Sequence, residues 1–81
     1  MILRVKLFAA MRDLAGDESA DVGLPDGATV GDLRRELGKV LPLARSLLIR
    51  SGIAVNQDMA ENDRTLQATD EVAVIPPVSG G

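Results

Sequence analysis

The residues able to do chemistry in this sequence lie at its end, where Gly80 and Gly81 follow Pro76-Pro77-Val78-Ser79. Glycine has no Cβ, so a Gly-Gly ending fits a narrow channel in a partner and leaves the carboxylate of Gly81 open to attack. Once activated, for instance as an acyl-adenylate, that carboxylate is an electrophile. A sulfur nucleophile that displaces AMP then leaves a thiocarboxylate. A glycine pair at a terminus can equally be a frayed end without a role.

Because two prolines come before the glycine pair, a chemical role for that pair has as much weight as a frayed end without a role. Pro76 and Pro77 have no N–H to donate to a sheet, so strand pairing should stop before them. An extended chain from Pro76 to Gly81 projects ~17 Å at ~3.3–3.6 Å per residue. We therefore expect a β-grasp domain over residues 1–75 and a flexible C-terminal Gly-Gly tail over residues 76–81.

What the chain lacks excludes most other chemistry. Its 81 residues contain no cysteine and no histidine, which excludes thiol nucleophiles, Cys/His zinc sites and a Ser-His-Asp triad. A net charge of −3 and a single aromatic residue, Phe8, argue against nucleic acid. There is no signal-peptide pattern and no run of ~20 apolar residues. We expect a cytoplasmic protein that binds no cofactor and no metal and does not associate with a membrane.

The elements that must position the tail follow from the hydrophobic pattern. Residues 2–8 alternate as in a strand, with Leu3, Val5 and Leu7 on one face. Residues 9–15 are helix formers, closed by Gly16 as a left-handed cap. Residues 17–24 form a plausible second strand.

The best helix of the chain starts after Thr29, a predicted N-cap with Asp32 three residues on, and ends near Pro42. Its apolar side and its polar side follow helical spacing. The apolar residues are Val30, Leu33, Leu37, Val40 and Leu41, and the polar ones are Arg34, Arg35 and Lys39.

The second half is less regular. Residues 43–50 fit a short helix or a strand, and residues 53–55 fit a strand followed by an Asn56-Gln57 turn. Residues 58–69 are polar and turn-rich, with Leu66 as an apolar anchor. Residues 71–75 suit a buried central strand. The helix must cross one face of the sheet, which makes the first and last strands parallel neighbours. The fold class is α+β, a β-grasp (ubiquitin-like) roll with a mixed sheet and one main helix on one face.

Motifs along the whole chain carry a resemblance to a known family. The ending Pro76-Pro77-Val78-Ser79-Gly80-Gly81, preceded by Asp70-Glu71-Val72-Ala73, is highly specific. Further matching motifs are Val5-Lys6-Leu7-Phe8-Ala9, Arg12, Leu14-Ala15-Gly16, Thr29-Val30, Leu33 and Ala54-Val55-Asn56-Gln57. The chain thereby resembles the MoaD family, the small subunits of molybdopterin synthase. It departs at Thr69, where the family usually has Gly, which suggests a changed turn.

The resemblance implies a sulfur carrier without catalytic side chains. A ubiquitin-activating-like (MoeB-like) adenylyltransferase would use ATP to adenylate Gly81, and a sulfur donor protein would supply the thiocarboxylate. The tail Pro76, Pro77, Val78, Ser79 and Gly80 would insert into a MoaE-like large subunit, which holds the catalytic residues. Two sulfur transfers would build the dithiolene of molybdopterin. The active synthase would resemble a heterotetramer with two small subunits.

Three alternatives stay open. A thiamine-pathway (ThiS-like) carrier uses the same carboxylate chemistry, but generally lacks the Pro-Pro-Val-Ser lead-in. A protein modifier would attach Gly81 to a target lysine through an isopeptide bond. The last alternative is a β-grasp interaction module with an inert tail.

Other residues are candidates for a partner surface. Strand parity places Phe8 opposite Leu3, so Phe8 and Ile75 form an exposed apolar patch or, alternatively, Phe8 packs under the following helix. Arg12 is a candidate contact to an acidic partner, although a solvated helix charge is the commoner role. Asp70 and Glu71 are adjacent on a strand and point to opposite faces, which favours a turn role over acid–base work.

Overall fold

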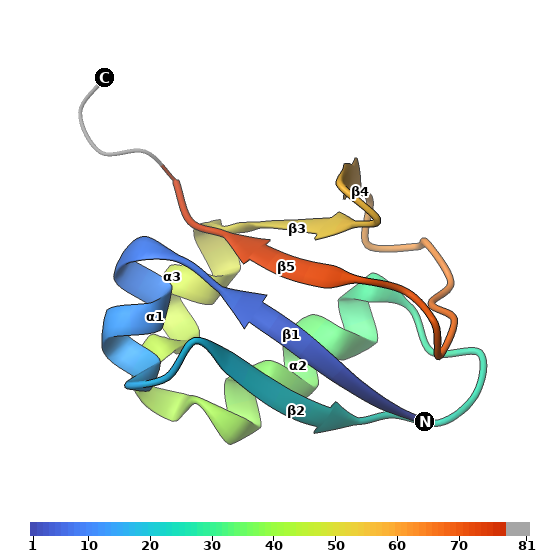
Figure 1. Cartoon of the computed structure of the whole chain (residues 1–81), viewed down its shortest axis with the longest axis horizontal. Helices are drawn as coiled ribbons and strands as arrows, with labels where there is room; N and C mark the ends of the chain where they lie inside the picture. Colours follow the sequence, from blue (N-terminus) through green and yellow to red (C-terminus); the bar gives the residue numbers. More distant parts are fainter. Residues whose placement is uncertain (78–81) are drawn as a thin grey trace.

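The chain folds into a mixed five-stranded sheet with helices packed against one face (Figure 1). The structure is a computed structural model, and it describes residues 1–77. The elements are β1 (Ile2–Leu7), α1 (Ala9–Ala15), β2 (Ser19–Gly23), α2 (Val30–Val40), the 3-10 helix η1 (Pro42–Ala44), α3 (Arg45–Arg50), β3 (Gly52–Val55), β4 (Asp58–Ala60) and β5 (Val72–Ile75). The strand order is β2-β1-β5-β3-β4. β1 and β5 pair in parallel, and the other three neighbouring pairs in this order are antiparallel. The predicted β-grasp roll, with its first and last strands paired in parallel, is confirmed.

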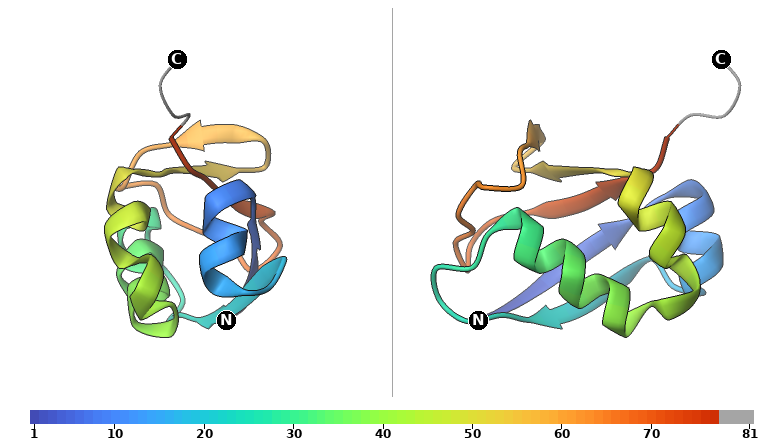
Figure 2. Two further views of the ribbon diagram at one scale, coloured as in Figure 1. Left: turned by 90° about the vertical axis from the view of Figure 1, so that its left-hand side faces the viewer. Right: turned by 180° about the vertical axis from the view of Figure 1, so that it is seen from behind.

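Alternation along β1 separates the two faces of the sheet. Leu3, Val5 and Leu7 are buried under the helices, whereas the residues between them are exposed. We call the helix-covered side the closed face and the other side the open face; Figure 2 shows the helices on one side only. Met11 of α1 and Leu33 and Leu37 of α2 complete the core from the helical side.

The predicted caps of the helices are confirmed. Gly16 ends α1 at φ 73°, in the left-handed region that glycine enters without strain. At the start of α2, the Asp32 N–H donates to Thr29 Oγ1 at 3.2 Å, and the Thr29 N–H donates to Asp32 Oδ2 at 2.9 Å. Aspartate therefore completes a full capping box here.

Two residues of α2 are not where the helical pattern places them. Val40 is 50% exposed, because α2 ends there and half-buried Leu41 turns inward instead. Arg34, expected on the solvent side, is half-buried. Its guanidinium Nη1 donates to the carbonyl oxygens of Leu48 and Ser51, both at 2.7 Å. A long cationic side chain thus binds the end of α3, where the Leu48 carbonyl oxygen also accepts the Ser51 N–H at 3.2 Å.

The structure resolves the ambiguous second half. Residues 42–50 are helical, first as η1 and then as α3. Asn56 and Gln57 take φ values of 53° and 72°, the geometry of a two-residue hairpin turn. Residues 58–60 therefore pair back onto β3 as β4, a strand that the polar composition of residues 58–69 concealed. Leu66 is buried, as expected of an anchor.

Candidate functional site: the base of the tail and the open face

The chain leaves the sheet from its central strand. β5 lies between β1 and β3, and its last residue, Ile75, pairs with Gly52. Strand structure ends there, before Pro76 and Pro77, as their missing N–H groups predict. A segment that follows β5 therefore starts at the centre of the sheet, between β1 and β3. The predictions for Val78, Ser79, Gly80 and Gly81 lie outside the described residues.

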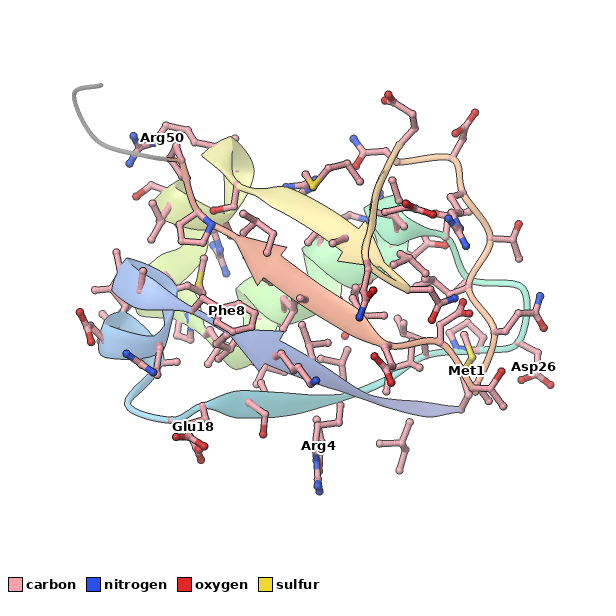
Figure 3. All side chains as sticks on the ribbon, turned by 45° about the horizontal axis from the view of Figure 1, so that its top comes forward. Met1, Arg4, Phe8, Glu18, Asp26 and Arg50 are labelled. Atoms are coloured by element: carbon pink, nitrogen blue, oxygen red, sulfur yellow. The ribbon has the colours of Figure 1, made fainter. Side chains whose placement is uncertain are left out.

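A hollow of about 380 Å³ lies on the open face beside the end of β5. Phe8 and Ile75 both line it, and they are 45% and 39% exposed. Phe8 therefore does not pack under α1, and Figure 3 shows its ring over the open face. The structure brings these two predicted residues together in one surface. The remaining lining residues are Lys6, Ala54, Gln57, Met59, Glu71, Val72 and Ala73.

Met59 is a residue of this surface that the sequence analysis missed. It lies on β4, is largely exposed, and its methyl group covers Gly52, because a Cβ placed on Gly52 would collide with it. Gly52 is also the partner of Ile75. Met59 is thus beside the base of the tail. The signal that could have found it is the Asn56-Gln57 turn, since a two-residue turn obliges the residues after it to form a strand.

Arg12 lines a second hollow, which adjoins the first. Arg12 of α1 lines this hollow of about 390 Å³ together with Phe8 and Lys6. Phe8 and Lys6 also line the hollow beside Ile75. Arg12 itself does not contact the Ile75 hollow. The predicted interface residues therefore form one surface, in which an apolar centre at Phe8 and Ile75 is bordered by charged side chains of both signs.

Asp70 holds the turn that leads into β5. Its carboxylate accepts the Gln67 N–H at 2.7 Å and the Asn56 side-chain amide at 2.9 Å. These bonds, the backbone one first, lower the pKa of Asp70, because they favour the charged form. Asn56 also bonds the backbone of Glu71 in both directions. The Asp70 carboxylate therefore has the predicted turn role, and Glu71 contributes to the turn through its backbone.

The turn itself explains how Thr69 is accommodated. The Asp70 N–H donates to the Gln67 carbonyl oxygen at 3.0 Å, which closes a four-residue turn with Thr69 in it. Among residues 1–77, the only non-glycine residues with positive φ are Ala9, Asn56 and Gln57. Thr69 thus keeps an ordinary backbone conformation, and glycine is not required there.

Across residues 1–77, no three Asp, Glu, His or Cys side chains are grouped as metal ligands would be. No helix in the same range has the length and apolar character needed to cross a membrane.

Comparison with known proteins gives matches over nearly the full length. The model of the ThiS family matches residues 5–81. The molybdopterin synthase sulfur carrier subunit of Dictyostelium discoideum is 38% identical, over 96% of this chain and 94% of that protein. The subunit of the same name in Escherichia coli is 35% identical, over 99% and 100%. In the crystal structure of small archaeal modifier protein 1 from Haloferax volcanii, a chain 31% identical superposes with a TM-score of 0.88, with both chains fully covered.

Proposed function

We propose that this chain, which belongs to the ThiS family, is the sulfur carrier subunit of a molybdopterin synthase. The observation that carries the proposal is the full-length similarity to proteins of that name from a eukaryote and a bacterium. The resemblance to the MoaD family noted in the sequence is confirmed by the same matches. Those names, which describe a subunit, also support a second subunit as the partner.

The carried sulfur resides on the carboxyl group of Gly81. An oxygen of this carboxylate attacks the α-phosphate of ATP on a MoeB-like adenylyltransferase, and pyrophosphate leaves. Sulfide-level sulfur released from a donor protein then attacks the acyl carbon of Gly81, AMP leaves, and a thiocarboxylate remains. In the synthase, the thiocarboxylate sulfur forms a bond to the pterin precursor. Water then cleaves the bond between that sulfur and the acyl carbon, and Gly81 returns to the carboxylate. This chain supplies no catalytic side chain, in line with its lack of cysteine and histidine.

The described residues support different roles for the two subunits: this chain supplies the tail and a docking surface, and a MoaE-like large subunit supplies the catalytic residues. β5 fixes the starting point of the tail in the middle of the sheet, and Phe8 and Ile75 offer an apolar surface around that point. Apolar side chains at the centre of a docking surface contribute most of the binding energy. The catalytic residues then belong to the large subunit, in a heterotetramer with two carriers.

The proposal is tested by following the mass of the intact chain. Protein loaded with sulfur at Gly81 is mixed with a large synthase subunit and the pterin precursor. The expected result is return to the plain carboxylate, dependent on both additions and accompanied by molybdopterin. If the thiocarboxylate persists while a known carrier reacts with the same large subunit, the chain is not a donor for this synthase.

A second candidate function is protein modification, because the modifier from Haloferax volcanii has the same fold at 31% identity. A modifier forms an isopeptide bond between Gly81 and a lysine of a target. High-mass conjugates that disappear when Gly80 and Gly81 are deleted would support it. A carrier for thiamine synthesis would instead transfer its sulfur only when a thiazole synthase is supplied.

A further inference from the structure

The cationic residues of this chain gather on its helical layer, although the chain as a whole is acidic. Residues 30–51, which span α2, η1 and α3, hold five of the nine Lys and Arg residues and two of the twelve acids. This segment has a formal charge of +3 and the rest of the chain has −6. The helical side therefore carries a positive field on a molecule of net charge −3. The five cations are Arg34, Arg35, Lys39, Arg45 and Arg50.

An open hollow of about 330 Å³ lies between α2 and α3 within this layer. All the cations of the segment except Arg50 line it, together with Gly38, Leu48 and Ile49, and no carboxylate does. Ile49 is 70% exposed, so its aliphatic side chain is open to contact with a partner. The hollow thus combines an uncovered apolar residue with a surrounding positive charge.

The cations around the hollow are available to an incoming acid. Within residues 1–77, Arg34 and Arg45 bond neutral groups rather than carboxylates: Arg34 donates to carbonyl oxygens at the end of α3, and Arg45 donates to that of Gly38. Arg35 and Lys39 pair with acids one helical turn earlier on α2. Such exposed pairs are weak, so a carboxylate from a partner can compete for them.

The hollow is separate from the surface around the tail. α2 and α3 cover the closed face, whereas Phe8 and Ile75 lie on the open face, and the two hollows share no lining residue. Figure 2 shows α2 and α3 on the opposite side of the sheet from that face. A protein bound between α2 and α3 therefore leaves the open face and the base of the tail accessible to another protein.

We propose that the hollow between α2 and α3 is a second docking site, for a protein segment with Asp or Glu side chains beside one or two aliphatic side chains. The aliphatic groups cover Ile49, and the carboxylates bind Lys39 and Arg45. Charge complementarity gives the segment its orientation and speeds its association. Nucleic acid fits poorly, because the rest of the chain has a charge of −6 and Phe8 is the only aromatic residue for stacking.

A peptide selection tests this site. A displayed library of random dodecapeptides is selected on the full chain and counter-selected on the variant Ile49→Asp, whose folding is checked by circular dichroism. The enriched peptides should combine acidic and aliphatic residues. In NMR spectra of the labelled chain, they should shift the amide signals of α2 and α3 and leave those around Phe8 unchanged.

A charge reversal with a matched control completes the test. Lys39→Glu should weaken peptide binding by about tenfold or more, as expected for a charge that meets a carboxylate at an interface. Arg4→Glu is the control, because Arg4 also makes an exposed ion pair but lies on β1, on the open face. The proposal is overturned if no peptide is enriched, if the peptides lack acids, or if both variants weaken binding equally. Shifts on the open face alone, or binding only to anionic vesicles or RNA, would overturn it too.

Discussion

Replacement of Arg34 by alanine should destabilise the fold far more than replacement of its neighbour Arg35. Arg34 donates two hydrogen bonds of 2.7 Å to the carbonyl oxygens that end α3. A hydrogen bond to a charged group contributes about 1.5–3 kcal/mol. Because both bonds come from one partly exposed nitrogen, we expect Arg34→Ala to lower the free energy of unfolding by about 2–4 kcal/mol.

That loss is large for so small a domain. At about 0.05–0.15 kcal/mol per residue, the whole chain should be stable by about 4–12 kcal/mol. The melting temperature should therefore fall by roughly 8–32 °C, since 1 kcal/mol corresponds to about 4–8 °C in domains of this size. Urea denaturation followed by circular dichroism gives the free energy, and thermal melting gives the temperature.

Arg35→Ala is the matched control. Arg35 is the next residue of α2, but it is exposed and its one ion pair within residues 1–77 is with Asp32, so its loss should cost less than about 1 kcal/mol. Arg34→Lys should give an intermediate value, because lysine keeps the charge but not the planar fork. Equal stabilities of the two alanine variants would show that the bonds from Arg34 to α3 do not stabilise the domain.

Three further outcomes are expected. Thr29→Ala removes one half of the capping box and should cost about 1 kcal/mol in urea denaturation; an unchanged midpoint would mean that α2 does not depend on its cap. Asp70 has a pKa below its ordinary value of 3.8, so the stability it contributes is present above that pH and is lost as the pH falls through the lower pKa of the folded state. Asp70→Asn should flatten the loss of stability below pH 3.8 seen in acid titration, and an identical acid limb in both proteins would contradict this. Phe8→Ser and Ile75→Ser should each weaken binding to a large synthase subunit by about tenfold in calorimetry, whereas Ile2→Ser, an equally apolar and more exposed change at the other end of the open face, should not.

The sequence predicts those parts of the fold that depend on local pattern. Alternation in β1 is enough to place Phe8 on the open face, and Gly16 and Thr29 are recognisable as caps from their neighbours alone. The side-by-side position of β1 and β5 follows from the order of the elements, because a crossing helix forces it. Phe8 and Ile75 could therefore be predicted together although they are far apart in the chain.

What the sequence does not predict depends on partners that only the folded chain supplies. Arg34 follows the polar side of α2 in spacing, and only the position of the α3 carbonyls draws it inward. α3 has six residues, fewer than two turns, so its periodicity cannot be distinguished from that of a strand. The position of Met59 depends on the backbone geometry of the Asn56-Gln57 turn, and the residues next to Met59 in the sequence do not indicate it. The role of Gly81 still rests on the chemistry of the ending and on family membership.

The parallel pairing of β1 with β5 has a consequence for biosynthesis. The strand that connects the two halves of the sheet is the last one to leave the ribosome, and its partner β1 is the first. Contacts between distant parts of a chain form late, because a large loop must close before they contribute. Without residues 72–75, the β1–β2 pair and the β3–β4 pair have no strand between them. The tail therefore follows the segment that completes folding, so an activating enzyme that requires the folded sheet would act only on finished molecules.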